Sequence, residues 1–356
     1  MLMRIELLKR EMIKSNADGY LISNINNIFY FTGFMDISDA TLSLIIPLDG
    51  EPTLLVPPLS YTAAKDNALN CLVNVISTKE KIIDKLFKKI KLNKLKKIEF
   101  DTLTTPVYME LIKKFKDVKI TPNQKPIWNL RRVKDAQEIS FLRKASTLAD
   151  IGIEAGIQAI KSGVKEYEIA AEAEYAMRLH GSEGIAFDTI IASGPRSAYP
   201  HGICTNRTIN KGDFVILDLG AISSGYRSDI TRTVVVGTPT KKQNKMLELV
   251  LRAHHKALEC IHENINAHEV DTNARDILKS EGYGKEFLHG LGHGVGLDIH
   301  EPPTLSSRSQ DILKAGNMVT VEPGIYLVGF GGVRIEDTVL VHKNYGERLT
   351  QAAYYL

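Results

Sequence analysis

The fold of this protein is decided by the segment FVILDLGAISSGYRSDITRTV, residues Phe214–Val234. Two apolar runs flank a pair of serines, which predicts an antiparallel hairpin. A turn between Ser223 and Ser224 would place Asp218 opposite Asp229, with Cβ atoms about 4.5–5.5 Å apart. Two like charges repel at that distance, so the pair indicates a cation between them.

A second segment, MVTVEPGIYLVGFGGVRIEDTV (Met318–Val339), repeats this design. A hairpin centred on Gly329 would place Glu322 opposite Glu336, again inside apolar runs where an unpaired carboxylate is costly to bury. Taken singly, each hairpin is explained equally well by a salt bridge from a carboxylate to a nearby arginine. The recurrence of the pair in two hairpins favours a shared ligand. The arginines in question are Arg227, Arg232 and Arg334.

Three histidines lie in the glycine-rich segment FLHGLGHGVGLDIHEPP, residues Phe287–Pro303. Glycines at this density allow tight turns and close approach to a ligand, so His289, His293 and His300 are candidates for a metal or catalytic site. The four carboxylates and His293 together make a set that balances the charge of two divalent ions. Carboxylate-rich ligand sets favour Mn²⁺, with Zn²⁺, Co²⁺ or Fe²⁺ as alternatives.

Two other kinds of site are excluded by their spacing. A zinc site of the HExxH type needs a second histidine four residues after the first, and neither His262-Glu263 nor His268-Glu269 is followed by one. The alternating glycines of residues 290–296 have neither the spacing nor the βαβ surroundings of a dinucleotide-binding loop. The carboxylate set is therefore the leading candidate for the chemistry.

The length of 356 residues predicts two domains, and the mild net charge of +3 gives no reason to expect a nucleic-acid partner. Three widely spaced cysteines, Cys71, Cys204 and Cys260, fit a reducing compartment. Residues 1–14 form an amphipathic helical pattern without the apolar core of a signal peptide. No stretch is long and apolar enough for a membrane span. We therefore expect a cytoplasmic protein.

Element patterns divide the chain into an α/β domain over residues 1–127, a linker over 128–134 and a second domain over 135–356. In the first domain we expect strands at 18–22, 28–31, 42–46, 53–56, 71–76, 97–100 and 118–120, with helices at 1–14, 81–90 and 106–115. This domain holds no histidine, so we place no catalytic site there. Lysines between Lys79 and Lys97 alternate with apolar residues at helical spacing, which predicts a solvated helix face and not a nucleic-acid surface.

The second domain opens on Asp135 followed by Glu138, a capping box that starts a helix running to about residue 161. We expect a second helix at 166–180, a strand at 187–192, and two further helices at 241–263 and 270–281. A loop rich in glycine and proline follows the strand and carries His201.

In these motifs the chain resembles the pita-bread metallopeptidases, the family of prolidase, aminopeptidase P and methionine aminopeptidase. DGYLI (18–22) and YFTGF (30–34) resemble the creatinase/prolidase N-terminal domain, which methionine aminopeptidases lack. Creatinase shares both domains but not the metal ligands. The family's five ligands match without substitution: Asp218 in LDLG, Asp229 in SDITR, His293 in GHGVGL, Glu322 in VEPGIY and Glu336 in VRIED.

The resemblance implies a fold and a ligand arrangement. The fold is an α/β domain like that of creatinase and prolidase, followed by an α+β pita-bread catalytic domain. In the latter, helices back an antiparallel sheet with pseudo-twofold symmetry. The protein would be a homodimer with two divalent ions per subunit. Asp218 and Asp229 would hold one ion, His293 and Glu322 the other, and Glu336 would bridge both.

The resemblance also implies a reaction, hydrolysis of the Xaa-Pro peptide bond by a hydroxide that bridges the two ions. Glu322 would carry a proton from the attacking water to the leaving proline nitrogen. His201 and His300 would position the scissile carbonyl and stabilise the oxyanion. The other substrate-side residues are His289, Arg308 and Arg334. His289 would contact the substrate or support the metal ligands, and Arg334 would be a buried partner of the carboxylates. Arg308 would bind the substrate's C-terminal carboxylate, or else be an ordinary solvent-exposed loop arginine.

We expect a metal-dependent exopeptidase of the Xaa-Pro dipeptidase (prolidase) type. The alternative is an aminopeptidase P that takes longer peptides, but Arg308 and the modest chain length favour the dipeptidase. A non-catalytic pita-bread binding module is a remoter alternative, because such relatives lose metal ligands and this chain keeps five. The expected partners are proline-containing di- or oligopeptides and a second copy of the chain, with no nucleic acid and no membrane.

Overall fold

The computed structural model describes residues 2–36, 41–78 and 80–355. The chain forms two compact units, Met1–Arg131 and Arg132–Leu356. Residues 128–131, assigned above to a linker, instead complete helix α6 (Lys125–Arg131). Met1 and Lys79, which bound two of the sequence predictions, lie outside the described residues. No helix among the residues that are described is long and apolar enough to cross a membrane.

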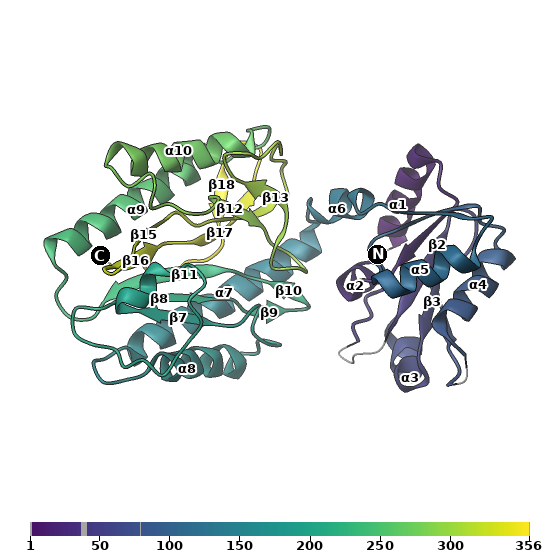
Figure 1. Ribbon diagram of the computed structural model, residues 1–356, viewed down its shortest axis with the longest axis horizontal. Helices are drawn as coiled ribbons and strands as arrows, with labels where there is room; N and C mark the ends of the chain where they lie inside the picture. Colours follow the sequence, from purple (N-terminus) through teal and green to yellow (C-terminus); the bar gives the residue numbers. More distant parts are fainter. Residues whose placement is uncertain (1, 37–40, 79, 356) are drawn as a thin grey trace. The chain divides into compact units, whose positions relative to one another are not determined.

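The first unit is built on a six-stranded mixed sheet in the order β4-β3-β2-β1-β5-β6 (Figure 1). In helix α4, Ile83, Leu86 and Ile90 are buried against this sheet, so the lysines between them face outward as their spacing predicts. The strands are β1 (Gly19–Ile22), β2 (Ser43–Pro47), β3 (Thr53–Val56), β4 (Leu72–Val75), β5 (Lys97–Phe100) and β6 (Lys119–Pro122). The helices before α6 are α1 (Leu2–Ser15), α2 (Ile25–Thr32), α3 (Pro58–Asn67), α4 (Ile82–Leu92) and α5 (Thr105–Lys114).

The strand predicted at residues 28–31 is wrong, because these residues lie in helix α2. The side chain of Asn24 caps the helix by accepting a hydrogen bond from the backbone N–H of Asn27, and Gly33 ends it in the left-handed conformation. A run of four apolar residues fits a strand or a buried helix equally well, and the capping residues on either side decided for the helix. Helix α3 was not predicted.

The second unit consists of two halves, each a pair of helices packed on strands. In the first half, α7 and α8 cover the sheet β11-β8-β7; in the second, α9 and α10 cover the sheet β13-β12-β14-β17-β18. Figure 1 shows the two helix pairs on opposite outer sides with the strands between them. This is the predicted α+β arrangement with two similar halves.

The helices of this unit are α7 (Ala136–Ala159), α8 (Glu166–Leu179), α9 (Lys241–Cys260) and α10 (Ala267–Ser280), with a short 3-10 helix η1 (Gly194–Ala198). The predicted capping box of Asp135 and Glu138 is present at the start of α7. The strands of the first half are β7 (Ile190–Ser193), β8 (Phe214–Leu219), β9 (Ile222–Ser223), β10 (Tyr226–Arg227) and β11 (Ile230–Val235). Those of the second are β12 (Gly292–Gly294), β13 (Glu301–Leu305), β14 (Met318–Val321), β15 (Gly324–Leu327), β16 (Gly331–Arg334), β17 (Asp337–Val341) and β18 (Gly346–Arg348).

The first carboxylate hairpin forms, but its predicted register is wrong. Asp218 pairs with Thr231 and not with Asp229, which lies two residues earlier and just ahead of β11. The turn consists of Ser224 and Gly225, which have φ values of 50° and 78°. Positive φ at both positions characterises the type I′ turn that suits a two-residue hairpin, so the turn lies one residue later than predicted.

The second hairpin has the predicted register. Val321 pairs with Asp337 in the β14–β17 ladder, and Gly324 pairs with Arg334 in the β15–β16 ladder. Both ladders share one alignment, so Glu322 and Glu336 lie opposite each other in the short gap between them. Each glutamate therefore lies between two strands of the hairpin, at the point where one ladder of backbone hydrogen bonds ends and the next begins.

The two halves meet along what we call the central seam, where residues 229–233 run antiparallel to residues 334–338. Thr231 forms an isolated β-bridge with Glu336, whose N–H donates to the Thr231 carbonyl at 3.1 Å. The Thr231 hydroxyl also donates to Glu336 Oε2 at 2.6 Å. Glu336 is thus held through both its backbone and its side chain.

Threonine hydroxyls replace the ladder bonds on either side of this bridge. The hydroxyl of Thr338 donates to the carbonyl of Asp229 at 2.8 Å and accepts from its N–H at 3.3 Å. The hydroxyl of Thr233 does the same for the carbonyl and N–H of Arg334, at 2.8 and 3.1 Å. A hydroxyl can donate and accept at once, so each threonine satisfies both backbone groups of the residue opposite.

We predict that Gly220→Ala destabilises the protein. A Cβ at Gly220 would lie 2.0 Å from the Ser228 carbonyl oxygen, because the two arms of the first hairpin approach each other closely at this point. Relief of that clash requires a backbone shift, with a cost of about 1–3 kcal/mol. Denaturant unfolding measures the loss. In the matched variant Gly184→Ala, the nearest atom would be 3.8 Å away, so a similar loss in both variants would contradict this explanation.

Candidate active site

A cavity of about 540 Å³ opens between the two halves of the second unit. Its floor is polar, and apolar side chains such as Phe187 and Ile190 form part of its wall. Arg308 is exposed and is not among the residues that line the cavity, although Ser306, two residues earlier, is. The predicted site residues that line it are Asp218, Asp229, His293, Glu322, Glu336, His201, His289, His300 and Arg334.

His293 directs its unprotonated ring nitrogen towards the carboxylates. Its Nδ1 lies 3.0 Å from the Gly294 carbonyl and donates to it, so Nε2 carries the lone pair. That Nε2 lies 3.4 Å from Glu322 Oε1 and 3.6 Å from Asp229 Oδ2. A lone pair facing two carboxylates is repulsive, whereas a cation between them would be bound by all three groups.

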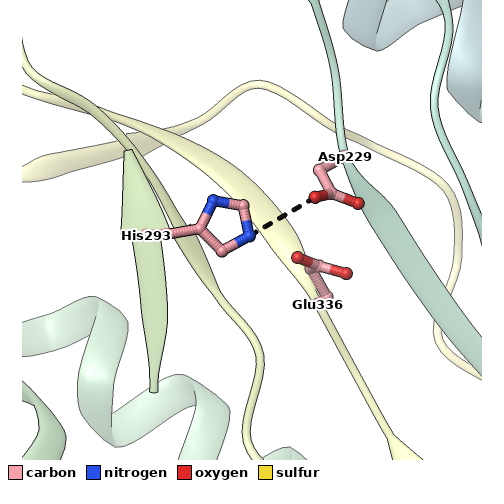
Figure 2. A group of neighbouring side chains, drawn as sticks. All are labelled: Asp229, His293 and Glu336. Carbon is pink, nitrogen blue, oxygen red and sulfur yellow. Dashed lines mark ion pairs between the residues drawn. The ribbon is translucent and has the colours of Figure 1, made fainter. Parts of the chain in front are cut away.

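Asp229, His293 and Glu336 bring ligand atoms within 4.8 Å of one another. Figure 2 shows the three side chains converging from different segments: His293 from β12, Asp229 from the chain just before β11, and Glu336 from the central seam. This compact group is smaller than the predicted set of five. Asp218 and Glu322 line the same cavity outside it.

Two buried carboxylate oxygens in this cavity have no hydrogen-bond partner among the described residues, Asp218 Oδ1 and Glu336 Oε1. The second oxygen of each is bonded: Asp218 Oδ2 pairs with Arg334, and Glu336 Oε2 accepts from Thr231. The alternative explanation, a salt bridge to an arginine, therefore accounts for only one of the two oxygens of Asp218. Unpaired buried oxygens are costly, and oxygen ligands suit hard divalent ions, so the donor set fits such an ion.

Burial and mutual repulsion shift the titration of this cluster. Burial and the neighbouring carboxylates raise the pKa values of Asp229 and Glu336 well above their ordinary range. Burial raises the pKa of Glu322 to about 8 and lowers the pKa of His293 to about 4. Every shift favours the uncharged side chain. Without a cation, the cluster therefore holds protons at neutral pH.

A chain of hydrogen bonds supports the Asp218 side of the cavity. Arg334 Nη1 donates to the Tyr326 hydroxyl at 2.8 Å, and that hydroxyl lies 2.9 Å from His289 Nε2. His289 Nδ1 lies 2.8 Å from the Gly290 carbonyl, so Nδ1 donates there and Nε2 accepts from Tyr326. Burial lowers the pKa of His289 to about 4, which keeps it neutral. His289 therefore supports Arg334, and through it Asp218.

His300 and His201 occupy different parts of the wall. The His300 ring packs edge-on against His293, with centroids 4.3 Å apart. The next residue, Glu301, forms a buried ion pair with Lys134 at 2.6 Å. His201 is exposed and stands on the loop between η1 and β8.

Several residues that hold the site were not predicted, namely Tyr326, Thr231, Thr338 and Thr320. Strand alternation could have found two of them, because Tyr326 is four residues after Glu322 and Thr231 is two after Asp229. Thr320 accepts from the backbone N–H of His293 at 3.0 Å. That contact joins segments 27 residues apart, so no local pattern marks it.

Comparisons with known proteins give a family match for each part of the chain. The model of metallopeptidase family M24 matches residues 140–343, and that of the creatinase/prolidase N-terminal domain matches residues 4–133. The Xaa-Pro dipeptidase of Pyrococcus furiosus is 41% identical to this chain over 349 residues, which covers 98% of this chain and 97% of the relative.

Solved structures extend the likeness to the whole fold. The prolidase of Pyrococcus horikoshii OT3 matches with a TM-score of 0.93 and 39% identity, over 99% of each chain. The X-Pro aminopeptidase of Thermotoga maritima MSB8 matches with a TM-score of 0.87 and 33% identity, over 98% of this chain and 100% of that chain. The predicted fold class is confirmed.

We predict that Mn²⁺ binding releases protons at pH 7, because a cation displaces the protons that the raised carboxyl pKa values retain. The raised pKa of Glu322 also means that the metal-free protein loses stability as the pH rises from about 4.5 towards 8. Titration calorimetry in PIPES and in Tris, which differ in ionisation enthalpy, measures the release. It should shrink at pH 9, and equal heats in both buffers at pH 7 would contradict it.

Proposed function

Because the chain belongs to metallopeptidase family M24, we propose that it is an Xaa-Pro dipeptidase, which hydrolyses the bond before proline in dipeptides. One observation carries the proposal. Asp229, His293 and Glu336 converge in the cavity with a buried oxygen of Glu336 left unpaired, which is a site built for a cation. Relatives named Xaa-Pro dipeptidase and prolidase match nearly the full chain, and they supply the substrate class.

The donor set suits two divalent ions per subunit, with Mn²⁺ preferred and Zn²⁺, Co²⁺ or Fe²⁺ as alternatives. Asp218 and Asp229 would hold one ion, His293 and Glu322 the other, and Glu336 both. When bound, such ions lower the pKa of water and polarise the scissile carbonyl. A non-catalytic binding module would have no use for this complete set.

Glu322 is the proton carrier in this proposal. Its Oε1 faces His293, while Oε2 lies 4.0 Å from His289 Nδ1. In the metal-free protein burial raises its pKa to about 8, and a bound cation would lower that pKa, which leaves the carboxylate ionised and able to take a proton. Oε2 would accept a proton from the attacking water and deliver it to the proline nitrogen, so the leaving group departs as a neutral amine.

His201 and His300 are the proposed contacts to the scissile carbonyl. Burial lowers the pKa of His300, so its ring is neutral and donates a single N–H at neutral pH. Both histidines line the cavity that holds the carboxylates. An N–H aimed at the oxygen that becomes negative in the transition state stabilises that state more than the substrate.

The preference for dipeptides rests on Arg308. It lies two residues after the cavity-lining Ser306 in the chain, although it does not itself line the cavity. A guanidinium there would pair with the C-terminal carboxylate of a dipeptide. The alternative is an aminopeptidase P that acts on longer peptides. The match to the X-Pro aminopeptidase of Thermotoga maritima is the observation that supports this alternative.

We also propose a homodimer located in the cytoplasm. The dimer follows from the family resemblance. The location is supported by Cys71, Cys204 and Cys260, which are all free thiols, as is usual in a reducing compartment.

We predict that Asp229→Ala and Glu322→Ala each lower Mn²⁺-dependent hydrolysis of Ala-Pro by more than about 1000-fold, because several kcal/mol of transition-state stabilisation is lost. Circular dichroism should show an intact fold. The exposed carboxylate Asp276 on α10 provides the control, and Asp276→Ala should keep full activity. Full activity in either site variant, or wild-type protein that binds no metal, would refute the two-ion proposal.

We predict that the wild type hydrolyses Ala-Pro faster than Ala-Pro-Ala. Arg308→Ala should raise KM for Ala-Pro about tenfold or more, because a charge-assisted hydrogen bond to the substrate carboxylate is lost. It should leave KM for Ala-Pro-amide unchanged. Lys343→Ala removes another exposed cation and serves as control. Faster turnover of the tripeptide would favour the aminopeptidase P alternative.

A further inference from the structure

A buried carboxylate outside the metal cluster, Glu166, gathers five hydrogen bonds. It is the first residue of α8 and is fully buried. Its Oε1 accepts from the N–H and the hydroxyl of Ser193, at 2.9 and 2.7 Å. Its Oε2 accepts from the N–H and the hydroxyl of Thr205, at 2.9 and 2.6 Å, and from the guanidinium of Arg196.

These contacts join the two ends of one loop. Ser193 is the last residue of β7, and Thr205 follows it after the eleven residues 194–204. The loop carries His201, and Pro200 and Ile203 on either side of it also line the cavity. One carboxylate thus closes the loop that bears a proposed catalytic histidine.

Arg196 connects Glu166 to Ile203, which lies two residues after His201. Its Nη1 donates to Glu166 while its Nη2 donates to the Ile203 carbonyl at 2.7 Å. The start of the loop is fixed separately, because Ser197 accepts from the N–H of Gly332 in β16 at 2.8 Å. Within residues 199–204, Arg334 Nη1 also donates to the Pro200 carbonyl at 3.2 Å, and the Cys204 thiol donates to the Thr189 carbonyl at 3.0 Å. Glu166 and Arg196 add the contacts that tie the two ends of the loop to one buried carboxylate.

The chemistry of the anchor requires a charged carboxylate. An ionised carboxylate only accepts hydrogen bonds and offers about four lone-pair sites, and here five donors surround it. Arg196 and the N-terminus of α8 compensate its burial. A glutamine would place an NH₂ group against donors on one side, which breaks one end of the closure while it keeps the shape of the side chain.

We propose that Glu166 is the positioning residue for His201. By closing the loop, Glu166 fixes the backbone that carries His201. The exposed ring of His201 then faces the scissile carbonyl. Ordering a loop costs backbone entropy, and without the closure that cost would have to be met by substrate binding. The inference rests on the proposed function for its kinetic consequence, but the placement of His201 can be measured without any reaction.

The kinetic test is a double-mutant cycle on Ala-Pro hydrolysis with Glu166→Gln, His201→Ala and the double variant. We expect Glu166→Gln to lower kcat about 10- to 100-fold, as misplacement of a catalytic group by about 1 Å does. In the His201→Ala background it should change kcat less than twofold, because the residue it positions is gone. Glu172→Gln, an exposed carboxylate on the same helix, should leave kcat unchanged. A loss from Glu166→Gln of equal size in both backgrounds would overturn the proposal.

The structural test uses ¹³C-labelled histidine and NMR on Zn²⁺-loaded protein, because paramagnetic Mn²⁺ would broaden signals from the cavity. The His201 signal is assigned by its absence in His201→Ala. Glu166→Gln should shift or broaden that signal and leave those of His180 and His262 unchanged. An unchanged His201 signal would overturn the proposal even if the protein hydrolysed no Xaa-Pro peptide. A shifted signal in a protein without peptidase activity would refute the proposed function alone.

If Glu166→Gln fails to fold, Arg196→Met carries the same tests. It removes the contacts to Glu166 and to the Ile203 carbonyl from a side chain that is 23% exposed, so folding tolerates it better. We expect a smaller fall in kcat, which again disappears in the His201→Ala background. Wild-type kcat together with an unchanged His201 signal in Arg196→Met would overturn the proposal.

Discussion

The central seam is the constraint on which the site depends. Asp229 belongs to one half of the domain and Glu336 to the other, so their distance is set by how the halves join. A side-chain hydroxyl, Thr338 opposite Asp229, bonds both backbone groups of that ligand, and Thr231 bonds both the backbone and the side chain of Glu336. The two carboxylates are therefore held mainly through their backbones, by short threonine hydroxyls and one main-chain bond, which leave less freedom than long side chains do.

The same seam concentrates negatively charged side chains in a buried part of the protein. Arg334 balances Asp218. Arg232 also lies at the seam, but it donates to the Glu336 carbonyl and pairs with Asp337, so it supports the backbone and does not neutralise the cluster. The remaining charge has to be met by protons or by a cation. The raised carboxyl pKa values and the two unpaired oxygens are two consequences of this one imbalance, and both disappear when a divalent ion binds.

The sequence indicated which carboxylates line the cavity, because buried carboxylates on strands are rare without a partner. Their role as metal ligands stays a prediction. The sequence predicted the second hairpin correctly, since the register depends only on the turn at Gly329. It placed the first turn one residue too early, which put the predicted partner of Asp218 two residues off, because a type I′ turn at Ser224 and Gly225 depends on positive φ values that apolar alternation does not encode. The seam could not be predicted, because Asp229 and Thr338 are 109 residues apart and their pairing follows from the packing of two complete halves.

His201 and His300, the proposed contacts to the substrate, are held in another way. Each lies outside the seam, next to a buried charge: His300 precedes Glu301, which pairs with Lys134, and His201 lies in the loop that Glu166 closes. A buried charge with full hydrogen bonding is directional and costly to break, so it can fix an irregular segment that lacks ladder bonds. The proposed metal ligands and the proposed substrate contacts thus have separate supports. The substrate wall can then vary while the ligands stay in place, which gives a physical reason why relatives of one fold are named Xaa-Pro dipeptidase in one case and X-Pro aminopeptidase in another.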